Sequence, residues 1–163
     1  MGISDVLAVL DALAHAGCRT WVGGGWGVDA LAGRQTRPHR DLNLAVDANH
    51  LAAALEVLQV LGFVVETDWR PVRVELVADA SRWVDLHPVV FDSDGNGRQP
   101  DVDGGHFEYP RDCFTAGSIG GVAVACLSVD QQLRFQTGYP ARDDDRHDLA
   151  LLHDLTDDER GHG

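Results

Sequence analysis

Three polar side chains with oxygen atoms alternate with apolar residues in two segments of the chain. Asp41 and Asn43 stand two residues apart among leucines, and Asp85 stands between a valine and a leucine. Such alternation is typical of strands, so in each segment the polar side chains face away from the apolar ones. If the two strands are neighbours, three oxygen donors converge on a site that can hold Mg²⁺ against phosphates. Solvated strand residues are the alternative.

A glycine-rich run precedes the first of these segments. Gly23-Gly24-Gly25 is followed by Trp26 and a short helical segment. Backbone N–H groups at a strand-to-helix turn, with the helix N-terminus behind them, form a site for phosphate groups. The run does not match the dinucleotide fingerprint, because Val28 occupies its last glycine position. The alternative is that the glycines only allow a tight turn.

The charge balance excludes several classes of protein. The chain has 26 acidic and 13 basic residues, which gives a formal net charge of −13. Such a surface disfavours nucleic acid and favours cationic partners. Every basic residue is an arginine, so a P-loop, a protein kinase site of the usual form and Schiff-base chemistry are excluded, since each needs a lysine.

The sequence predicts a cytoplasmic protein without membrane or nucleic-acid partners. No apolar run reaches the roughly 18 residues that span a membrane, and residues 1–5 lack the features of an export signal. The cysteines, Cys18, Cys113 and Cys126, are widely spaced, which favours free thiols in a reducing compartment. A zinc or nucleophilic role for one of them is the less favoured alternative.

The order of expected elements predicts an α/β (α+β) fold, with a mixed β-sheet flanked by helices and short C-terminal helices. We expect one domain over residues 1–155 and a frayed polar tail over 156–163. Ser4 and Ser128 are expected helix caps. The expected helices cover residues 3–16, 24–32, 48–61, 129–137 and 144–155. The expected strands cover 20–23, 42–46, 63–67, 72–78, 82–91, 107–109 and 121–127, with a loop at 99–105.

The motifs together resemble a known family. The run Gly24-Gly25-Trp26, the segment 33–43 (Gly-Arg-Gln-Thr-Arg-Pro-His-Arg-Asp-Leu-Asn) and Val84-Asp85-Leu86-His87-Pro88 resemble the antibiotic nucleotidyltransferases. The chain is most similar to the small lincosamide nucleotidyltransferases, and then to the aminoglycoside 2″-adenylyltransferases. Segment 139–149 also resembles the C-terminal part of the lincosamide group. The similarity covers nearly the whole chain and implies a polymerase-beta-like nucleotidyltransferase fold.

The resemblance implies that a nucleoside monophosphate is transferred from an NTP, with ATP as the expected donor, to an antibiotic hydroxyl, giving drug resistance. Asp41, Asn43 and Asp85 would bind one or two Mg²⁺ ions, and Asp85 would also take the hydroxyl proton. A homodimer is compatible with the resemblance. The residues expected to bind the nucleotide are Gly24, Gly25, Trp26, Arg34, Arg37 and His39. Their alternatives are a solvated loop for the arginines, a structural hydrogen bond for His39 and core packing for Trp26.

Asn43 departs from the family pattern, which is Asp-x-Asp. An asparagine lacks the negative charge and the second carboxylate oxygen, so we expect weaker metal binding and turnover slower by orders of magnitude. A deliberate substitution, a degenerate enzyme and a tolerant site are all open explanations. A non-catalytic nucleotide- or drug-binding module and an aminoglycoside nucleotidyltransferase are the alternative functions. Glu75 and Glu108 are candidates to bind a drug amine, with simple solvent exposure as the alternative.

Overall fold

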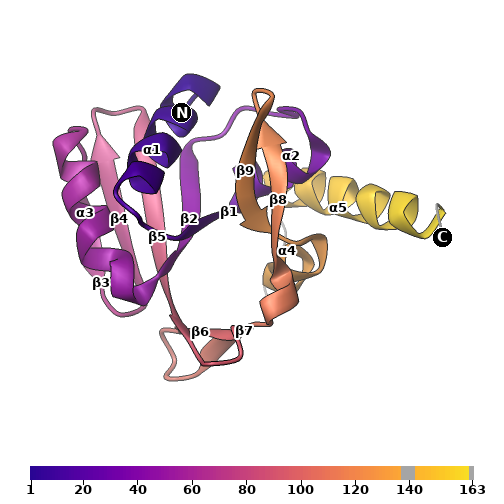
Figure 1. The fold of residues 1–163 in the computed structure, drawn as a ribbon. Coiled ribbons are helices and arrows are strands. Elements are labelled where there is room, and N and C mark those ends of the chain that lie inside the picture. The colour runs from indigo at the N-terminus through magenta and orange to yellow at the C-terminus, as the bar shows by residue number, and fades with distance from the viewer. Residues whose placement is uncertain (137–141, 162–163) are drawn as a thin grey trace.

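The computed structural model describes residues 1–136 and 142–161, which form one mixed β-sheet with helices around it (Figure 1). The strands of the main sheet lie in the order β3-β4-β5-β2-β1-β9-β8, and β6 and β7 extend β5 as a small hairpin. The strands are β1 (Thr20–Gly23), β2 (Asp41–Asp47), β3 (Val64–Trp69), β4 (Arg73–Ala78), β5 (Arg82–Phe91), β6 (Gly97–Pro100), β7 (His106–Tyr109), β8 (Phe114–Ile119) and β9 (Val122–Leu127). The helices are α1 (Ile3–His15), α2 (Gly24–Ala32), α3 (Leu51–Val60), α4 (Val129–Phe135) and α5 (Asp143–Gly161).

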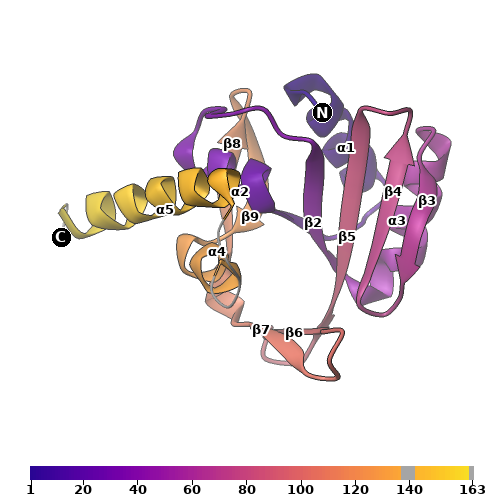
Figure 2. The same ribbon diagram turned by 180° about the vertical axis from the view of Figure 1, so that it is seen from behind.

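The helices divide between the two sides of the sheet. Helices α1 and α3 lie side by side over one face, and the view from behind shows α2, α4 and α5 gathered near β8 and β9 (Figure 2). On that second side the strands β2, β4 and β5 carry no helix directly over them. The polar face of these strands is therefore free to line a site.

The main core lies between the sheet and helices α1 and α3. Apolar side chains alternate along β2, β4 and β5, and those on the core side are fully buried because they pack against the apolar stripes of the two helices. They include Leu42, Leu44, Val74, Leu76, Val84 and Leu86 from the strands and Val6, Val9, Leu13 and Leu58 from the helices. A second, aromatic cluster contains Trp21 of β1 and Tyr109 of β7, together with buried residues of β2, β5 and β9.

Most of the expected elements are confirmed, and several details of the chain differ. The predicted loop at 99–105 is wrong at its start, because residues 97–100 form β6 between β5 and β7. Strand β8 was not predicted, since its Thr-Ala-Gly-Ser stretch shows no clear alternation, and pairing with β9 stabilises it. Ser4 does not cap α1; Gly2 occupies the N-cap position. Ser128 does cap α4, with its side chain accepting from the Gln131 backbone N–H.

The C-terminal helix is longer than expected. The predicted end of this helix at residue 155 and the frayed tail after it are wrong as far as Gly161, because α5 continues to that residue and projects beyond the sheet (Figure 1). Acidic residues in its first turn and Arg160 in its last turn both favour the helix dipole. Residues 137–141, which include part of the family-like segment 139–149, lie outside the described residues.

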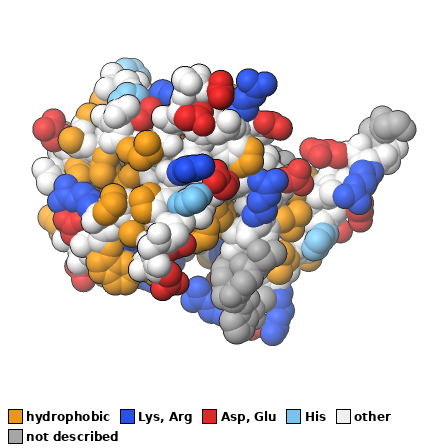
Figure 3. Space-filling model, turned by 90° about the horizontal axis from the view of Figure 1, so that it is seen from below, with side chains coloured by type: hydrophobic (Ala, Val, Ile, Leu, Met, Phe, Trp, Pro, Cys, Tyr) orange, Lys and Arg blue, Asp and Glu red, His pale blue; other side chains and the backbone are white. Residues whose placement is uncertain are grey.

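The surface agrees with a charged, acidic chain. Seen from below, arginine and acidic side chains lie next to one another, together with exposed hydrophobic side chains (Figure 3). Within the described part of the chain, no helix has both the length and the apolar character needed to cross a membrane.

All three cysteines are free and buried, which predicts slow thiol chemistry. Burial raises the pKa of Cys18, and it raises those of Cys113 and Cys126 to about 12 and about 11. Because the thiolate is the reactive form, we expect less than about a tenth of the thiols of the native protein to react with a disulfide reagent within minutes at pH 8. Full reaction of all three in guanidinium is the control; equally fast reaction of the native protein would contradict the burial.

Candidate active site

A cleft of about 620 Å³ opens between the polar face of the sheet and the helices α2, α4 and α5. The floor comes from β2, β4 and β5, and the rim comes from the glycine turn, the N-terminal end of α5 and the β6–β7 hairpin. The lining residues with charged side chains are Arg37, Arg40, Asp41, Arg73, Glu75, Asp85, Arg142, Asp144, Asp145 and Asp148. The glycine turn also contributes Gly24 and Gly25, and β2 contributes Asn43.

The predicted convergence of the three oxygen donors is confirmed. Strands β2 and β5 pair in parallel, with Asn43 opposite Asp85 in the register. Asp41, Asn43 and Asp85 therefore share one face and all line the cleft. Glu75 joins them from β4, because that strand pairs antiparallel with β5 and places Glu75 opposite Asp85.

Asp85 is a buried carboxyl group that lacks a full set of partners. Its side chain is 9% exposed, and its Oδ1 atom has no hydrogen bond within the described residues. Burial raises the pKa of Asp85 to about 7; the Arg73 guanidinium, 3.6 Å from Oδ1, opposes this shift, while Glu75 and Asp41 add to it. A nearby cation would therefore stabilise the ionised form of this carboxyl group.

The oxygen donors fit a divalent cation that shares its ligands with a substrate. Mg²⁺ takes oxygen ligands and is usually held by one or two carboxylates together with phosphates. Asp41 and Asp85 supply two carboxylates, and Asp85 Oδ1 is unsatisfied. Among the residues that the structure describes, no three His, Cys, Asp or Glu side chains are arranged to hold a metal on their own. A cation at Asp41 and Asp85 thus needs further oxygen ligands.

Asn43 lies between a histidine and an acid. His87 Nε2 is 3.2 Å from Asn43 Oδ1, and Asn43 Nδ2 is 3.5 Å from Asp41 Oδ1. His87 lies within β5, which continues to Phe91. Burial and the Arg73 charge lower the pKa of His87 to about 4. The neutral imidazole can donate one hydrogen bond and accept another.

The glycine turn is shaped by close contact with these residues. Gly24 has φ +59°, and a Cβ atom there would lie 2.7 Å from Asn43 Nδ2. A Cβ at Gly25 would collide with His39 and with Arg37. Glycines are thus required for the turn to approach β2, and the turn lines the cleft. The tight turn expected from the sequence is confirmed, and the phosphate site stays a prediction.

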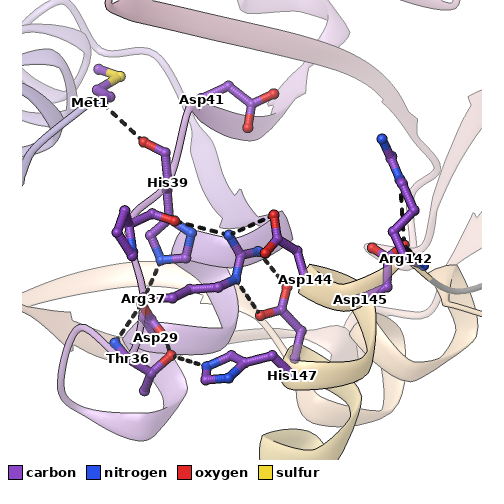
Figure 4. Close-up of polar contacts among 12 residues, drawn as sticks. Met1, Asp29, Thr36, Arg37, His39, Asp41, Arg142, Asp144, Asp145 and His147 are labelled. Carbon is purple, nitrogen blue, oxygen red and sulfur yellow. Dashed lines mark hydrogen bonds and ion pairs between the residues drawn. The ribbon is translucent and has the colours of Figure 1, made fainter.

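Arg37 reaches the cleft, but most of its hydrogen-bonding capacity is used inside the protein. Its Nε and Nη2 atoms donate to the two oxygens of Asp148 at 3.0 and 2.8 Å, and Asp144 lies 3.7 Å from Nη1 (Figure 4). The hydrogen bonds to Asp148 raise the pKa of Arg37, so its guanidinium stays protonated. Arg37 therefore connects α5 to the loop between α2 and β2.

His39 belongs to a buried hydrogen-bonded group beside the turn. Its Nε2 atom is 2.5 Å from Asp29 Oδ2, and Asp29 also accepts from the Thr36 backbone and hydroxyl (Figure 4). Burial alone would raise the pKa of Asp29, but the hydrogen bonds from His39 and Thr36 outweigh it and lower that pKa. The His39 carbonyl accepts from the amine of Met1 at 2.9 Å. His39 is thus a structural residue rather than a lining residue of the cleft.

Two further predicted nucleotide contacts are not brought to the cleft. Trp26 is 1% exposed and packs in the core with its ring 4.7 Å from that of His39, so the interpretation as core packing replaces the predicted contact. Arg34 is exposed and lies outside the cleft lining. By contrast, sequence reasoning missed Arg73, although it shares its strand face with Glu75 and the alternation of β4 could have indicated it.

Comparison with known proteins shows the family of this chain. Residues 5–152 match the family model described as aminoglycoside-2″-adenylyltransferase. The chain belongs to this family. The lincosamide resistance protein of Staphylococcus haemolyticus is 32% identical to this adenylyltransferase-family chain over 152 residues, which cover 93% of the chain and 94% of the relative. The resemblance to lincosamide nucleotidyltransferases is therefore confirmed.

Solved structures confirm the fold of this adenylyltransferase-family member. A lincosamide antibiotic adenylyltransferase crystallised with lincomycin matches with a TM-score of 0.84 and 32% identity, over 93% of this chain and 96% of the other. ANT(2″)-Ia in complex with adenylyl-2″-tobramycin matches with a TM-score of 0.74 and 18% identity, over 92% and 86%. The second likeness concerns the fold alone. The predicted polymerase-beta-like nucleotidyltransferase fold is thus confirmed.

The ion pair between Arg37 and Asp148 predicts a large contribution to stability. The Asp148 side chain is 3% exposed and that of Arg37 is 17% exposed. Removing one partner of a buried pair leaves the other charge uncompensated, so we expect Asp148→Asn to lower the free energy of unfolding by about 3 kcal/mol. Urea denaturation measures this value. Asp154→Asn, at an exposed position of the same helix, is the matched control and should change the free energy of unfolding little. Equal losses in the two variants would contradict a stabilising role of the Arg37–Asp148 pair.

Proposed function

We propose that the chain transfers a nucleoside monophosphate from an NTP to a hydroxyl group of an antibiotic, with a lincosamide as the substrate, and so gives drug resistance. The observation that carries the proposal is the convergence of Asp41, Asn43 and Asp85 on two adjacent parallel strands, beside the glycine turn. The 32% identity to a lincosamide resistance protein and to a lincomycin-bound adenylyltransferase supports the choice of drug.

The glycine turn is the proposed phosphate site. Gly24 and Gly25 stand at the N-terminus of α2, where free backbone N–H groups and the helix dipole favour a triphosphate. Asp41 and Asp85 would hold Mg²⁺ on the facing strands. When bound, the ion would neutralise charge on the phosphates of the nucleotide, for which ATP is the proposed donor.

Asp85 is the proposed base for the transfer. The oxygen of the drug hydroxyl forms a bond to the α-phosphorus, the bond between the α-phosphorus and the bridging oxygen breaks, and pyrophosphate leaves. The hydroxyl proton passes to a carboxylate oxygen of Asp85. A bound cation would keep Asp85 ionised at the start of the transfer, as a base requires.

The acidic rim supports a drug that carries an amine. Glu75 lines the floor of the cleft, and Asp144 and Asp145 line its edge at the start of α5. These carboxylates can attract and bind a cationic group. Glu108, the other candidate from the sequence, is instead paired with His106 at 2.8 Å outside this cleft. We propose that the protein acts in the cytoplasm, where NTPs are available; the homodimer stays a prediction.

The activity test uses the protein with lincomycin or clindamycin, ATP or GTP, and Mg²⁺. Mass spectrometry detects the nucleotidylated drug. Because the Asn43 amide lacks the negative charge that would bind a metal ion beside the transferred phosphoryl group, we expect Asn43→Asp to raise kcat by on the order of 10²-fold. We expect Asp85→Asn to abolish product. Asn49→Asp, at an exposed position just after β2, is the matched control and should leave the rate unchanged.

Other outcomes separate the alternative functions. Product with an aminoglycoside but with neither lincosamide would reassign the substrate, an option that the family model keeps open. Nucleotide or drug binding by calorimetry, without turnover even in Asn43→Asp, would support a non-catalytic binding module.

The role of the glycine turn predicts a specific loss of nucleotide affinity. Gly24 and Gly62 both have positive φ, at +59° and +95°, so alanine strains the backbone at either site. A Cβ at Gly62 meets nothing within 4 Å, whereas one at Gly24 meets Asn43. We expect Gly24→Ala to weaken ATP binding at least about tenfold by calorimetry, since the turn must move. Gly62→Ala, the control, should leave the affinity unchanged; an equal loss in both variants would contradict the assignment.

A further inference from the structure

The side-chain amide of Asn43 can present either its oxygen or its nitrogen to the cleft, and this choice decides what Asn43 can bind. An amide oxygen accepts hydrogen bonds and can coordinate a cation, whereas the NH₂ group only donates. The two ends are similar in size, so the hydrogen-bond network must determine the orientation. In this chain the network can be followed back to a buried tyrosine.

The network starts at Tyr109, which is 2% exposed. Its hydroxyl donates to Gln99 Oε1 at 2.6 Å, and Gln99 Nε2 donates to the Val72 carbonyl at 3.3 Å. A backbone carbonyl can only accept, so the amide of Gln99 has its nitrogen on that side. The same nitrogen lies 3.1 Å from His87 Nδ1 and donates to it.

The tautomer of His87 determines the orientation of the Asn43 amide. Because His87 Nδ1 accepts a hydrogen bond, the ring carries its proton on Nε2. That Nε2–H group donates to Asn43 Oδ1 at 3.2 Å, while Asp85 Oδ2 lies farther away at 3.6 Å. The amide of Asn43 is therefore oriented with its oxygen toward His87. We refer to the chain of hydrogen bonds from Tyr109 through Gln99 to His87 as the amide relay.

The nitrogen of Asn43 then faces the site. Its Nδ2 atom lies 3.5 Å from Asp41 Oδ1 and borders the glycine turn, where a Cβ at Gly24 would lie 2.7 Å away. An aspartate at this position could accept from His87 with one oxygen and still offer the other to a cation. The asparagine offers an N–H group there instead.

We propose that the amide relay acts as a positioning device that holds the Asn43 NH₂ group toward the cleft. Asn43 then serves as a hydrogen-bond donor to a phosphate oxygen of the nucleotide, and not as a metal ligand. The site of this chain binds one divalent cation, through Asp41 and Asp85. The inference rests on the proposed nucleotidyl transfer. It adds that the neutral Asn43 amide, a hydrogen-bond donor, takes the place of the carboxylate that would bind a metal ion.

The first test measures the tautomer of His87 in the protein without metal or nucleotide. Long-range proton–nitrogen NMR spectra distinguish a protonated ring nitrogen from a bare one, and His87→Gln assigns the signals. We expect a bare Nδ1 and a protonated Nε2. Gln99→Leu removes the donor to Nδ1 and should populate both tautomers. Gln59→Leu, at an exposed position of α3, is the matched control and should keep the original tautomer.

A proton on Nδ1 of His87 in the unaltered protein would overturn the relay. So would an unchanged tautomer in Gln99→Leu, because the relay would then not determine it. Neither result depends on catalysis.

The second test counts bound cations. Crystals are grown with Mn²⁺ and α,β-methylene-ATP, whose α–β bond cannot be cleaved in the transfer, and anomalous peaks are counted at Asp41 and Asp85. We expect one peak in the unaltered protein and in the control Asn49→Asp, and two in Asn43→Asp. Two peaks in the unaltered protein, or one in Asn43→Asp, would overturn the inference while the proposed function stands. Density without nucleotide in all three proteins would contradict the proposed function and the inference with it.

Discussion

The parallel pairing of β2 with β5 is the constraint on which both the core and the candidate site depend. It places Asn43 opposite Asp85 and directs the alternating leucines and valines of both strands to the opposite face, under α1 and α3. A shift of one residue would bury the carboxylates and expose the apolar side chains. Core burial therefore stabilises the register that brings the oxygen ligands together. The same pairing thus determines both the core and the positions of the site residues.

Charge in the cleft is distributed between structure and binding. Arg37 is paired with Asp148 and holds α5 against the loop between α2 and β2. It therefore contributes to the shape of the cleft. Asp85 has the Arg73 guanidinium 3.6 Å from its Oδ1 atom, and that oxygen has no hydrogen bond within the described residues. Buried polar groups are normally paired, and exceptions concentrate at functional sites. The Arg37–Asp148 pair is therefore structural, whereas the Asp85 oxygen is available to bind a ligand.

Much of the architecture could be predicted from sequence, for identifiable reasons. Alternation of polar and apolar residues indicated β2, β4 and β5, and it also indicated that Asp41, Asn43 and Asp85 lie on the polar faces. Strands β6 and β8 were not predicted, because each is short or rich in small residues and is stabilised by pairing with its neighbours. The resemblance indicated Trp26 and His39 as nucleotide contacts, but burial in the core and the bond to Asp29 place them elsewhere.

The sequence by itself determined the family, the fold and the substitution at Asn43, because these depend on residue types and on their spacing along the chain. Only the tertiary structure decided what Asn43 presents to the cleft. An amide has two ends of similar size, and its orientation follows from hydrogen bonds with distant residues: His87 on β5, Gln99 on β6 and Tyr109 on β7. Spacing along the chain carries no information about such a network, since the folding of the sheet and hairpin brings its members together.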